Sequence, residues 1–162
     1  MRKVCLIVGA GAGIGMATAR RFSKEGYYIC IVRRSDQNGL DNSVSELKTN
    51  GYEASGFMVD VTVPDDLESL VEKIETEIGP IDTAVYNVGA QIGDRYLDDT
   101  SLKVFELGWR LGTFGLFRLA KTLLPHMVER STGSLLVTGA TASVRGNGGQ
   151  HSHAATMASR RM

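Results

Sequence analysis

The segment VCLIVGAGAGIG, residues 4–15, joins a short apolar run to a glycine-rich turn. The run at 4–8 is continuously apolar, which is typical of a strand covered on both faces. The residues that follow, 13–25, fit a helix. Glycines at such a turn let a pyrophosphate approach the backbone, where the first N–H groups of the helix point at its charge. An ordinary tight turn would use the same glycines, but their position directly after the first strand favours dinucleotide binding.

The rest of the chain repeats this alternation of strand and helix. Four further apolar runs are predicted to be strands: 27–32, 56–61, 82–88 and 134–139. Further helices are predicted at 40–49, 65–78 and 101–129. Strands that alternate with helices form parallel βαβ units with right-handed crossovers. We therefore predict an α/β fold, a Rossmann-type doubly wound parallel sheet in three layers, α/β/α.

Composition limits the partners and the location of the protein. A chain of 162 residues with 43% hydrophobic content predicts a single domain over residues 1–162. Eighteen basic and eighteen acidic residues leave no basic field for a nucleic acid. Cys5 and Cys30 lie in apolar runs, so we expect buried free thiols in a reducing compartment. With no apolar window long enough to cross a membrane, the chain is predicted to be cytoplasmic, with neither membrane nor nucleic acid as a partner.

The glycines of the opening segment have a specific spacing. They fit G-x-x-x-G-x-G on Gly9, Gly13 and Gly15, whereas the commoner G-x-G-x-x-G would need a glycine at Ile14. We expect Gly9, Gly13, Ile14 and Gly15 to contact the cofactor. This spacing resembles the glycine-rich segment of the short-chain dehydrogenase/reductase family, although Val8 stands where that family usually has threonine.

Three further segments resemble the same family in the same order. They are the pair Asp60 and Val61, the segment YNVGA at 86–90 with Asn87 and Gly89 kept, and GSLLVTGATASVRG at 133–146. The resemblance spans the whole chain. It implies that Asp60 and Val61 contact adenine, that Asn87 and Gly89 belong to the cofactor site, and that a hydride passes between a nicotinamide and a small-molecule carbonyl or alcohol.

The end of the second predicted strand bears on the choice between NADP and NAD. Arginine there favours the 2′-phosphate of NADP, whereas an acidic residue accepts hydrogen bonds from the ribose hydroxyls of NAD. Arg33 and Arg34 occupy this end, so we predict NADP as the preferred cofactor. Asp36, about twenty residues past the glycines, keeps NAD open as an alternative, and a solvated turn would equally account for the two arginines.

The resemblance implies a catalytic serine, tyrosine, lysine and asparagine, and this chain has none of the four. Aligned without gaps, the serine position falls on Ala140, the tyrosine on His153, the lysine on Met157 and the asparagine on Gly112. Methionine carries no charge, so residue 157 cannot lower the pKa of a neighbour as a lysine would. The usual mechanism of the family cannot run on these residues.

His153 is the catalytic candidate that remains at these positions. An imidazole titrates near pH 6.5 and can transfer a proton without a lysine, and Thr141 or Ser143 could replace the lost serine. A structural histidine in a glycine-rich loop is the plainer interpretation. His151 and His153 lie two residues apart, the wrong spacing for a metal pair on one helical face, so no metal site is predicted. His126 is expected to be solvated or to cap the long helix.

The segment from 101 to 129 is apolar on more than one side, and the chain ends soon after the predicted active-site helix begins. In the resembled family such a helix pairs with a second subunit, which implies a homodimer or homotetramer, although burial within one subunit would also explain the pattern. The family fold continues further, so the domain is expected to be truncated at Met162 or to belong to a shortened relative.

Two functions from different classes follow. The first is an NADP(H)-binding oxidoreductase with an atypical or incomplete catalytic site. The second is a catalytically silent dinucleotide-binding sensor or scaffold, which the substituted catalytic positions favour. A Rossmann-like methyltransferase fits less well, because the segments at 86–90 and 137–143 match the dehydrogenase pattern in order.

Overall fold

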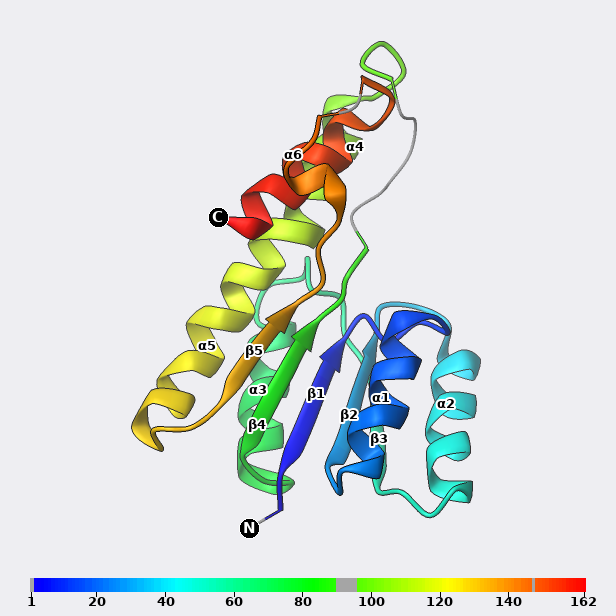
Figure 1. Cartoon of the computed structure of the whole chain (residues 1–162), viewed down its shortest axis with the longest axis vertical. Helices are drawn as coiled ribbons and strands as arrows, with labels where there is room; N and C mark the ends of the chain where they lie inside the picture. Colours follow the sequence, from blue (N-terminus) through cyan, green and yellow to red (C-terminus); the bar gives the residue numbers. More distant parts are fainter. Residues whose placement is uncertain (1, 90–95, 147) are drawn as a thin grey trace.

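The computed structural model describes residues 2–89, 96–146 and 148–162. Its centre is a five-stranded parallel sheet with the strand order β3-β2-β1-β4-β5 (Figure 1). The strands are β1 (Val4–Val8), β2 (Tyr28–Arg33), β3 (Ala54–Met58), β4 (Ile81–Tyr86) and β5 (Ser134–Val137). The order reverses direction between β1 and β4, which makes their carboxyl ends the switch point where this type of sheet binds ligands.

Helices cover both faces of the sheet, so the predicted three-layer fold is confirmed (Figure 1). The helices are α1 (Ile14–Lys24), α2 (Gln37–Thr49), α3 (Asp66–Glu77), α4 (Leu102–Trp109), α5 (Gly115–Glu129) and α6 (His151–Arg161). Alternate residues of β1 face opposite layers. Leu6 packs in the core with α3 and α5, whereas Ile7 packs in the core with α1 and α2. Among the described residues, no helix is long and apolar enough to cross a membrane.

The third strand was predicted at 56–61 and lies at Ala54–Met58, so its predicted bounds were wrong. Pairing starts two residues earlier because Ala54 lies opposite Ile29 of β2. The strand ends before Asp60, whose Oδ1 accepts hydrogen bonds from the backbone N–H and the hydroxyl of Thr62, at 2.8 and 2.7 Å. Such an Asx turn replaces the sheet hydrogen bonds and directs the chain away from the sheet.

The helix predicted at 101–129 is interrupted by a π-helical segment, η1 (Arg110–Phe114), between α4 and α5. The interruption lies where β4 ends, because the buried Tyr86 hydroxyl donates a hydrogen bond to the carbonyl oxygen of Leu111. A Cβ atom at Gly115 would collide with the same hydroxyl. Single π turns inside longer helices are frequent at functional sites.

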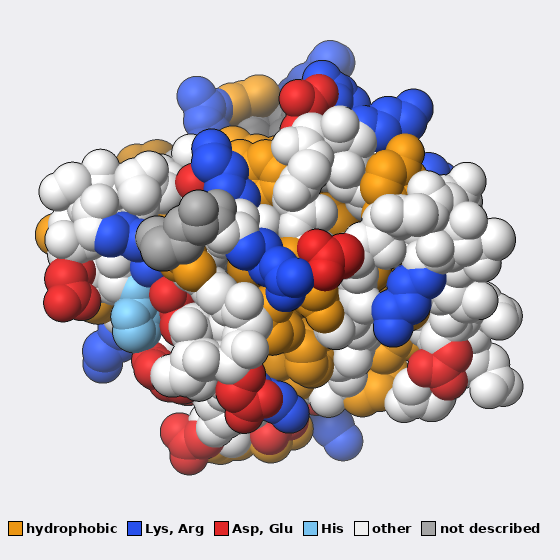
Figure 2. Space-filling model, turned by 90° about the horizontal axis from the view of Figure 1, so that it is seen from below, with side chains coloured by type: hydrophobic (Ala, Val, Ile, Leu, Met, Phe, Trp, Pro, Cys, Tyr) orange, Lys and Arg blue, Asp and Glu red, His pale blue; other side chains and the backbone are white. Residues whose placement is uncertain are grey.

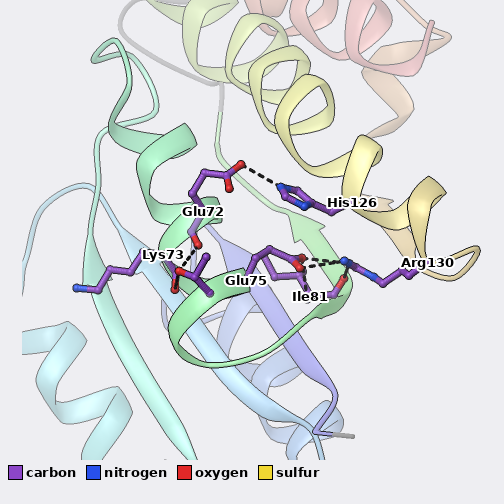
Figure 3. A network of polar contacts seen from close by, with 7 residues as sticks. Glu72, Lys73, Glu75, Ile81, His126 and Arg130 are labelled. Carbon is purple, nitrogen blue, oxygen red and sulfur yellow. Dashed lines mark hydrogen bonds and ion pairs between the residues drawn. The ribbon is translucent and has the colours of Figure 1, made fainter.

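Polar contacts tie α3 to α5 along one side of the sheet (Figure 3). Glu72 contacts His126 at 2.9 Å between Oε1 and Nε2, and the Glu75 carboxylate receives both terminal nitrogens of Arg130. His126, which was expected to be solvated or to cap the long helix, is partly exposed in the last turn of α5 and contacts a side chain of α3. One pair nearer the carboxyl ends of the strands, Glu68 and Arg118, continues the series.

The two cysteines are buried, as their place in apolar runs predicts, and the charges on one face of the molecule are mixed. Cys5 and Cys30 are free and buried, and burial raises the pKa of each thiol to about 12. They belong to the cores on opposite faces of the sheet, so they do not face each other. At the amino-terminal end of the strands, acidic and basic side chains are intermixed around apolar ones, and neither sign forms a continuous field (Figure 2).

Candidate functional site

A pocket of about 430 Å³ opens at the carboxyl ends of β1, β2 and β4. Its lining comes from five places: the end of β1 with its glycine turn, the end of β2 with its loop, the segment after β3, the segment after β4, and η1. The lining residues are Val8, Gly9, Ala10, Gly11, Val32, Arg33, Arg34, Ser35, Asp36, Val59, Val61, Asn87, Val88, Gly89 and Leu111. The pocket therefore lies at the switch point of the sheet, with the amino-terminal end of α1 beside the glycine turn.

Two of the predicted glycines are required by the protein itself. Gly9 has a φ of +90°, and a Cβ atom there would lie 2.8 Å from the backbone of Asn87 and Val88. At Gly15 a Cβ atom would lie 2.6 Å from the Cα atom of Ala10, because α1 crosses closely over the turn. These two positions let the chain reverse direction between β1 and α1.

Three other glycines are not explained by internal packing. A Cβ atom at Gly11, Gly13 or Gly89 would meet no protein atom within 4 Å, and none of the three has a positive φ. Gly11 and Gly89 line the pocket, and Gly13 is the N-cap of α1, whose first N–H groups have no acceptor within the helix. The N–H of Met16 donates to the carbonyl oxygen of Gly11 at 3.1 Å, whereas those of Ile14 and Gly15 have no acceptor among the described residues. The open space and these two donors form a cradle that fits a pyrophosphate. The sequence prediction missed Gly11, although the second glycine of GAGAGIG could have indicated it.

Asn87 fixes the floor of this cradle. Its backbone N–H donates to the carbonyl oxygen of Val8 at 2.8 Å, and its Nδ2 donates to the carbonyl oxygen of Gly9 at 2.9 Å. The end of β4 is thereby joined to the turn after β1. Ile14, in contrast, is 63% exposed at the first position of α1 and is not part of the pocket lining.

The two arginines after β2 have different environments. Arg33 is largely buried, and its guanidinium donates to the carbonyl oxygen of Ala10, to the Asp36 carboxylate and to the Ser43 hydroxyl at 2.8 to 2.9 Å. Arg34 is exposed at the mouth of the pocket. Asp36 also caps α2 by accepting a hydrogen bond from the Gly39 N–H. Arg33 and Asp36 thus form an ion pair that stabilises the loop after β2. Arg34 takes part in neither of these contacts.

The pair Asp60 and Val61 divides between two roles. Val61 is buried and lines the pocket beneath the loop after β3. Asp60 lies outside the lining, and its carboxylate is occupied by Thr62. Of the segment at 86–90, Ala90 lies outside the described residues.

The four positions aligned with catalytic residues are spread over three segments beyond the carboxyl ends of the strands. Gly112 is buried in η1, Ala140 is exposed before the short helical turn η2 (Thr141–Ser143), and His153 and Met157 lie on α6. Met157 is buried and contributes no polar atom. Thr141 lines a separate polar pocket with Arg145 and Gln150.

His153 lies on α6, the helix that was expected to carry residues 153–157. Within the described part of the chain its buried Nδ1 has no hydrogen-bond partner. Burial lowers the pKa of its imidazole, and the charge of Arg160 lowers it further. His151 has other partners: its ring stacks on Phe105, and its Nε2 lies 3.4 Å from the Thr100 hydroxyl. In the described chain, no three His, Cys, Asp or Glu side chains gather as a metal site.

Sequence reasoning missed Arg160, the buried cation of α6. Its guanidinium donates to the carbonyl oxygens of Gly112, Thr138 and Val88, at 3.0, 3.0 and 2.8 Å. It also lies over the ring of Tyr86, 5.3 Å from the centroid. The only signal in the sequence is its spacing, since residues 153, 157 and 160 fall on one face of a helix.

Comparison with known proteins agrees with this arrangement. The family model described as short chain dehydrogenase matches residues 3–160. The 3-oxoacyl-(acyl-carrier-protein) reductase FabG of Thermotoga maritima is 31% identical over 160 residues, which cover 96% of this chain and 63% of that protein.

Solved structures show the same fold. An actinorhodin polyketide ketoreductase variant with NADPH has a TM-score of 0.90 at 29% identity, covering 98% of this chain and 60% of that one. An NAD⁺-bound xylitol dehydrogenase has a TM-score of 0.90 at 26% identity, covering 97% and 60%. The chain thus spans about three fifths of the length of these relatives. With the family model matching almost from end to end, the chain belongs to the short-chain dehydrogenase family.

Proposed function

We propose that residues 1–162 form one domain that binds NADP(H) in the pocket between β1, β2 and β4. We further propose that this domain serves hydride transfer to or from a small-molecule carbonyl or alcohol at an atypical site. The observation that carries the proposal is the cradle. Gly11, Gly13 and Gly89 leave space that no atom of the described residues fills, beside the N–H groups of Ile14 and Gly15 at the start of α1.

The preference for NADP rests on Arg34. This side chain is exposed at the mouth of the pocket, and within residues 2–89, 96–146 and 148–162 it has no acceptor that a 2′-phosphate would have to displace. Arg33 supports the loop through its three hydrogen bonds and adds positive charge beneath it. The Asp36 carboxylate is bound by Arg33 and by the Gly39 N–H, which weakens the alternative in which Asp36 binds the ribose of NAD.

The chemistry that the bound cofactor supplies is the transfer of a hydride at its nicotinamide ring. The protein must then move one proton to or from the substrate oxygen. Of the four aligned catalytic positions, His153 alone carries a titratable side chain, and burial keeps its imidazole neutral near pH 7 by lowering its pKa. A neutral imidazole can accept the hydroxyl proton of an alcohol, which favours the oxidative direction.

A specific observation favours a second function. Gly112, Ala140 and Met157 offer no side-chain donor, acceptor or charge, so three of the four catalytic contributions of the family are absent. A protein that binds the dinucleotide without turnover, as a sensor or scaffold, needs only the cradle. Both functions use the same pocket, and they differ in whether His153 transfers a proton.

The assembly and the location follow from the same reasoning. Helices α4 and α5 expose large apolar side chains, among them Leu102, Trp109 and Phe117, which supports a homodimer or homotetramer through these helices. The mixed surface charges support a cytoplasmic protein whose partners are small molecules.

The experiment is a screen of alcohols with NADP⁺ and of carbonyls with NADPH, following the absorbance of the reduced cofactor. We expect slow turnover in the alcohol direction that His153→Ala reduces about a hundredfold, the typical contribution of a proton-transfer group. His126→Ala is the matched control, because that histidine lies on α5 against Glu72, away from α6. Cofactor binding without turnover across the panel would favour the silent function, and no binding would refute both.

A further inference from the structure

Arg160 is the most unusual side chain of α6. Only 8% of it is exposed, although arginine is rarely buried without a paired acid. Its acceptors are three backbone carbonyls from three segments: η1, the end of β4 and the end of β5. Within the described residues, no carboxylate forms an ion pair with it. The site therefore holds a fixed positive charge that only neutral groups surround.

The position of this charge on the helix matters. Residues 153, 157 and 160 lie on one face of α6, so Arg160 follows Met157 by about one turn. One of its acceptors is Gly112, which aligns with the catalytic asparagine of the family, and another is Val88, beside the cofactor pocket. The guanidinium thus connects the helix of His153 to the wall of the pocket.

We propose that Arg160 is a positioning residue of the site, which fastens α6 to η1, β4 and β5 and supplies, one turn past Met157, the fixed cation that the lysine position lacks. The inference rests on the proposed role of His153. It deepens that role by naming the group that sets the orientation of the helix and the charge of the imidazole.

The electrostatics around His153 agree with this assignment. Arg160 is the one charged group, among the described residues, that shifts the pKa of His153, and it acts in the same direction as burial. The other charged side chains on the elements packed against α6 are Lys103 and Glu106 of α4, Arg110 of η1 and Arg145 after η2. Arg110 donates to the carbonyl oxygen of Thr62, and the other three are exposed. Burial and, after it, the cation on the same helix face therefore both favour the neutral form of His153.

The test measures the imidazole directly and needs no cofactor. In protein labelled with ¹⁵N-histidine, each of His126, His151 and His153 gives its own pair of ring-nitrogen signals, which are followed by NMR as the pH is changed. In the wild type we expect His153 to titrate below its ordinary value of about 6.5. In Arg160→Met we expect its pKa to rise by about half a unit, the effect of a charge about 10 Å away along the helix. Arg161→Met, a change at the exposed neighbour, should leave the pKa of His153 unchanged.

A purely structural role for Arg160 predicts another pattern. Arg160→Met would then lower the melting temperature without moving the pKa of His153, and that result overturns the proposal. Arg160→Lys should lose most of the hydrogen bonds but keep the charge, so its His153 pKa should stay closer to the wild type than that of Arg160→Met.

If Arg160→Met does not fold, Arg160→Gln replaces it, because glutamine is neutral and still donates hydrogen bonds. A wild-type His153 that titrates at or above about 6.5 overturns the proposal without any variant. Failure of the proposed function is a separate result, since it would appear as a lack of NADPH binding while the NMR titration is unaffected.

Discussion

The central strand β1 and the outer strand β5 differ in how completely the protein encloses them. β1 is paired on both sides and covered by both helical layers, and none of its five residues is more than 1% exposed. β5 pairs only with β4 among the described strands, and its Leu136 and Val137 are 46% and 40% exposed. The glycine turn follows the enclosed strand, and three of the four substituted catalytic positions, Ala140, His153 and Met157, follow the exposed one. Close packing on all sides therefore fixes the nucleotide-binding region after β1. The region after β5, in contrast, is held by a few contacts such as those of Arg160.

The largest expected effect compares the glycines that follow these two strands. Gly9→Ala adds a Cβ atom against the backbone of Asn87 at a φ of +90°, so we expect a loss of at least about 3 kcal/mol in the free energy of unfolding. Gly139→Ala meets no atom within 4 Å and should change that free energy by less than about 1 kcal/mol. Chemical denaturation measures both. Equal losses of unfolding free energy would mean that the turns after β1 and β5 are packed alike.

A second test removes the same side chain from each strand. Leu6→Ala leaves a cavity in a fully buried position and should cost about 3 kcal/mol. Leu136→Ala at the exposed edge should cost less than about 1 kcal/mol. Urea midpoints and slopes of the two variants give the comparison. A large loss at Leu136 would show that another part of the protein or a second copy covers β5.

A third test sharpens the account of the nucleotide half by separating its two arginines. Arg34→Gln should weaken NADPH binding about tenfold, or 1.4 kcal/mol, and leave NADH binding and stability unchanged. Arg33→Gln breaks contacts with Ala10, Asp36 and Ser43 and should lower the melting temperature as well. Calorimetric titration with each cofactor measures the affinities. Stronger binding of NADH than of NADPH by the wild type would instead support the Asp36 alternative.

The smallest expected effects are two steps of acid destabilisation. The folded pKa of His153 is lowered, so the unfolded chain binds the proton more strongly and stability falls as the pH drops below about 6.5. The pKa of Glu68 is lowered mainly by its hydrogen bonds to Arg118, so its contribution is present above about pH 4.3 and is lost as the pH falls through the folded value.

Melting temperatures from pH 8 to 3 separate the two steps. His153→Gln should remove the step that begins below about pH 6.5 and Glu68→Gln the step below about pH 4.3, each less than about 1 kcal/mol. Loss of both steps in one variant would show that the regions are coupled.

The sequence predicted the enclosed region well, for a physical reason. Continuous apolar runs such as 4–8, and the apolar face of the helix at 66–77, reflect burial that the fold then supplies. Asp36 and Asp60 explain most of the boundary errors. Their side chains cap α2 and end β3 through local hydrogen bonds, which a hydrophobic pattern does not contain.

The candidate site was less predictable. The π segment around Gly112 depends on the Tyr86 hydroxyl, which lies 25 residues from its acceptor in sequence. The role of Arg160 depends on three carbonyls that come together only in the folded chain, so its sequence neighbours carry no sign of it. Arg33 was unpredictable for the same reason. Its position in the sequence suggested a phosphate contact, and its intramolecular partners come together only in the folded chain.

The central claim is that the open glycines beside α1 hold a dinucleotide, and calorimetric titration with NADPH tests it most directly. We expect saturable heat in the wild type, and at least a tenfold weaker affinity in Gly11→Ala, whose new methyl group would enter the cradle without disturbing any protein atom within 4 Å. No heat with NADPH or NADH, or an unchanged affinity in a folded Gly11→Ala variant, would contradict the account.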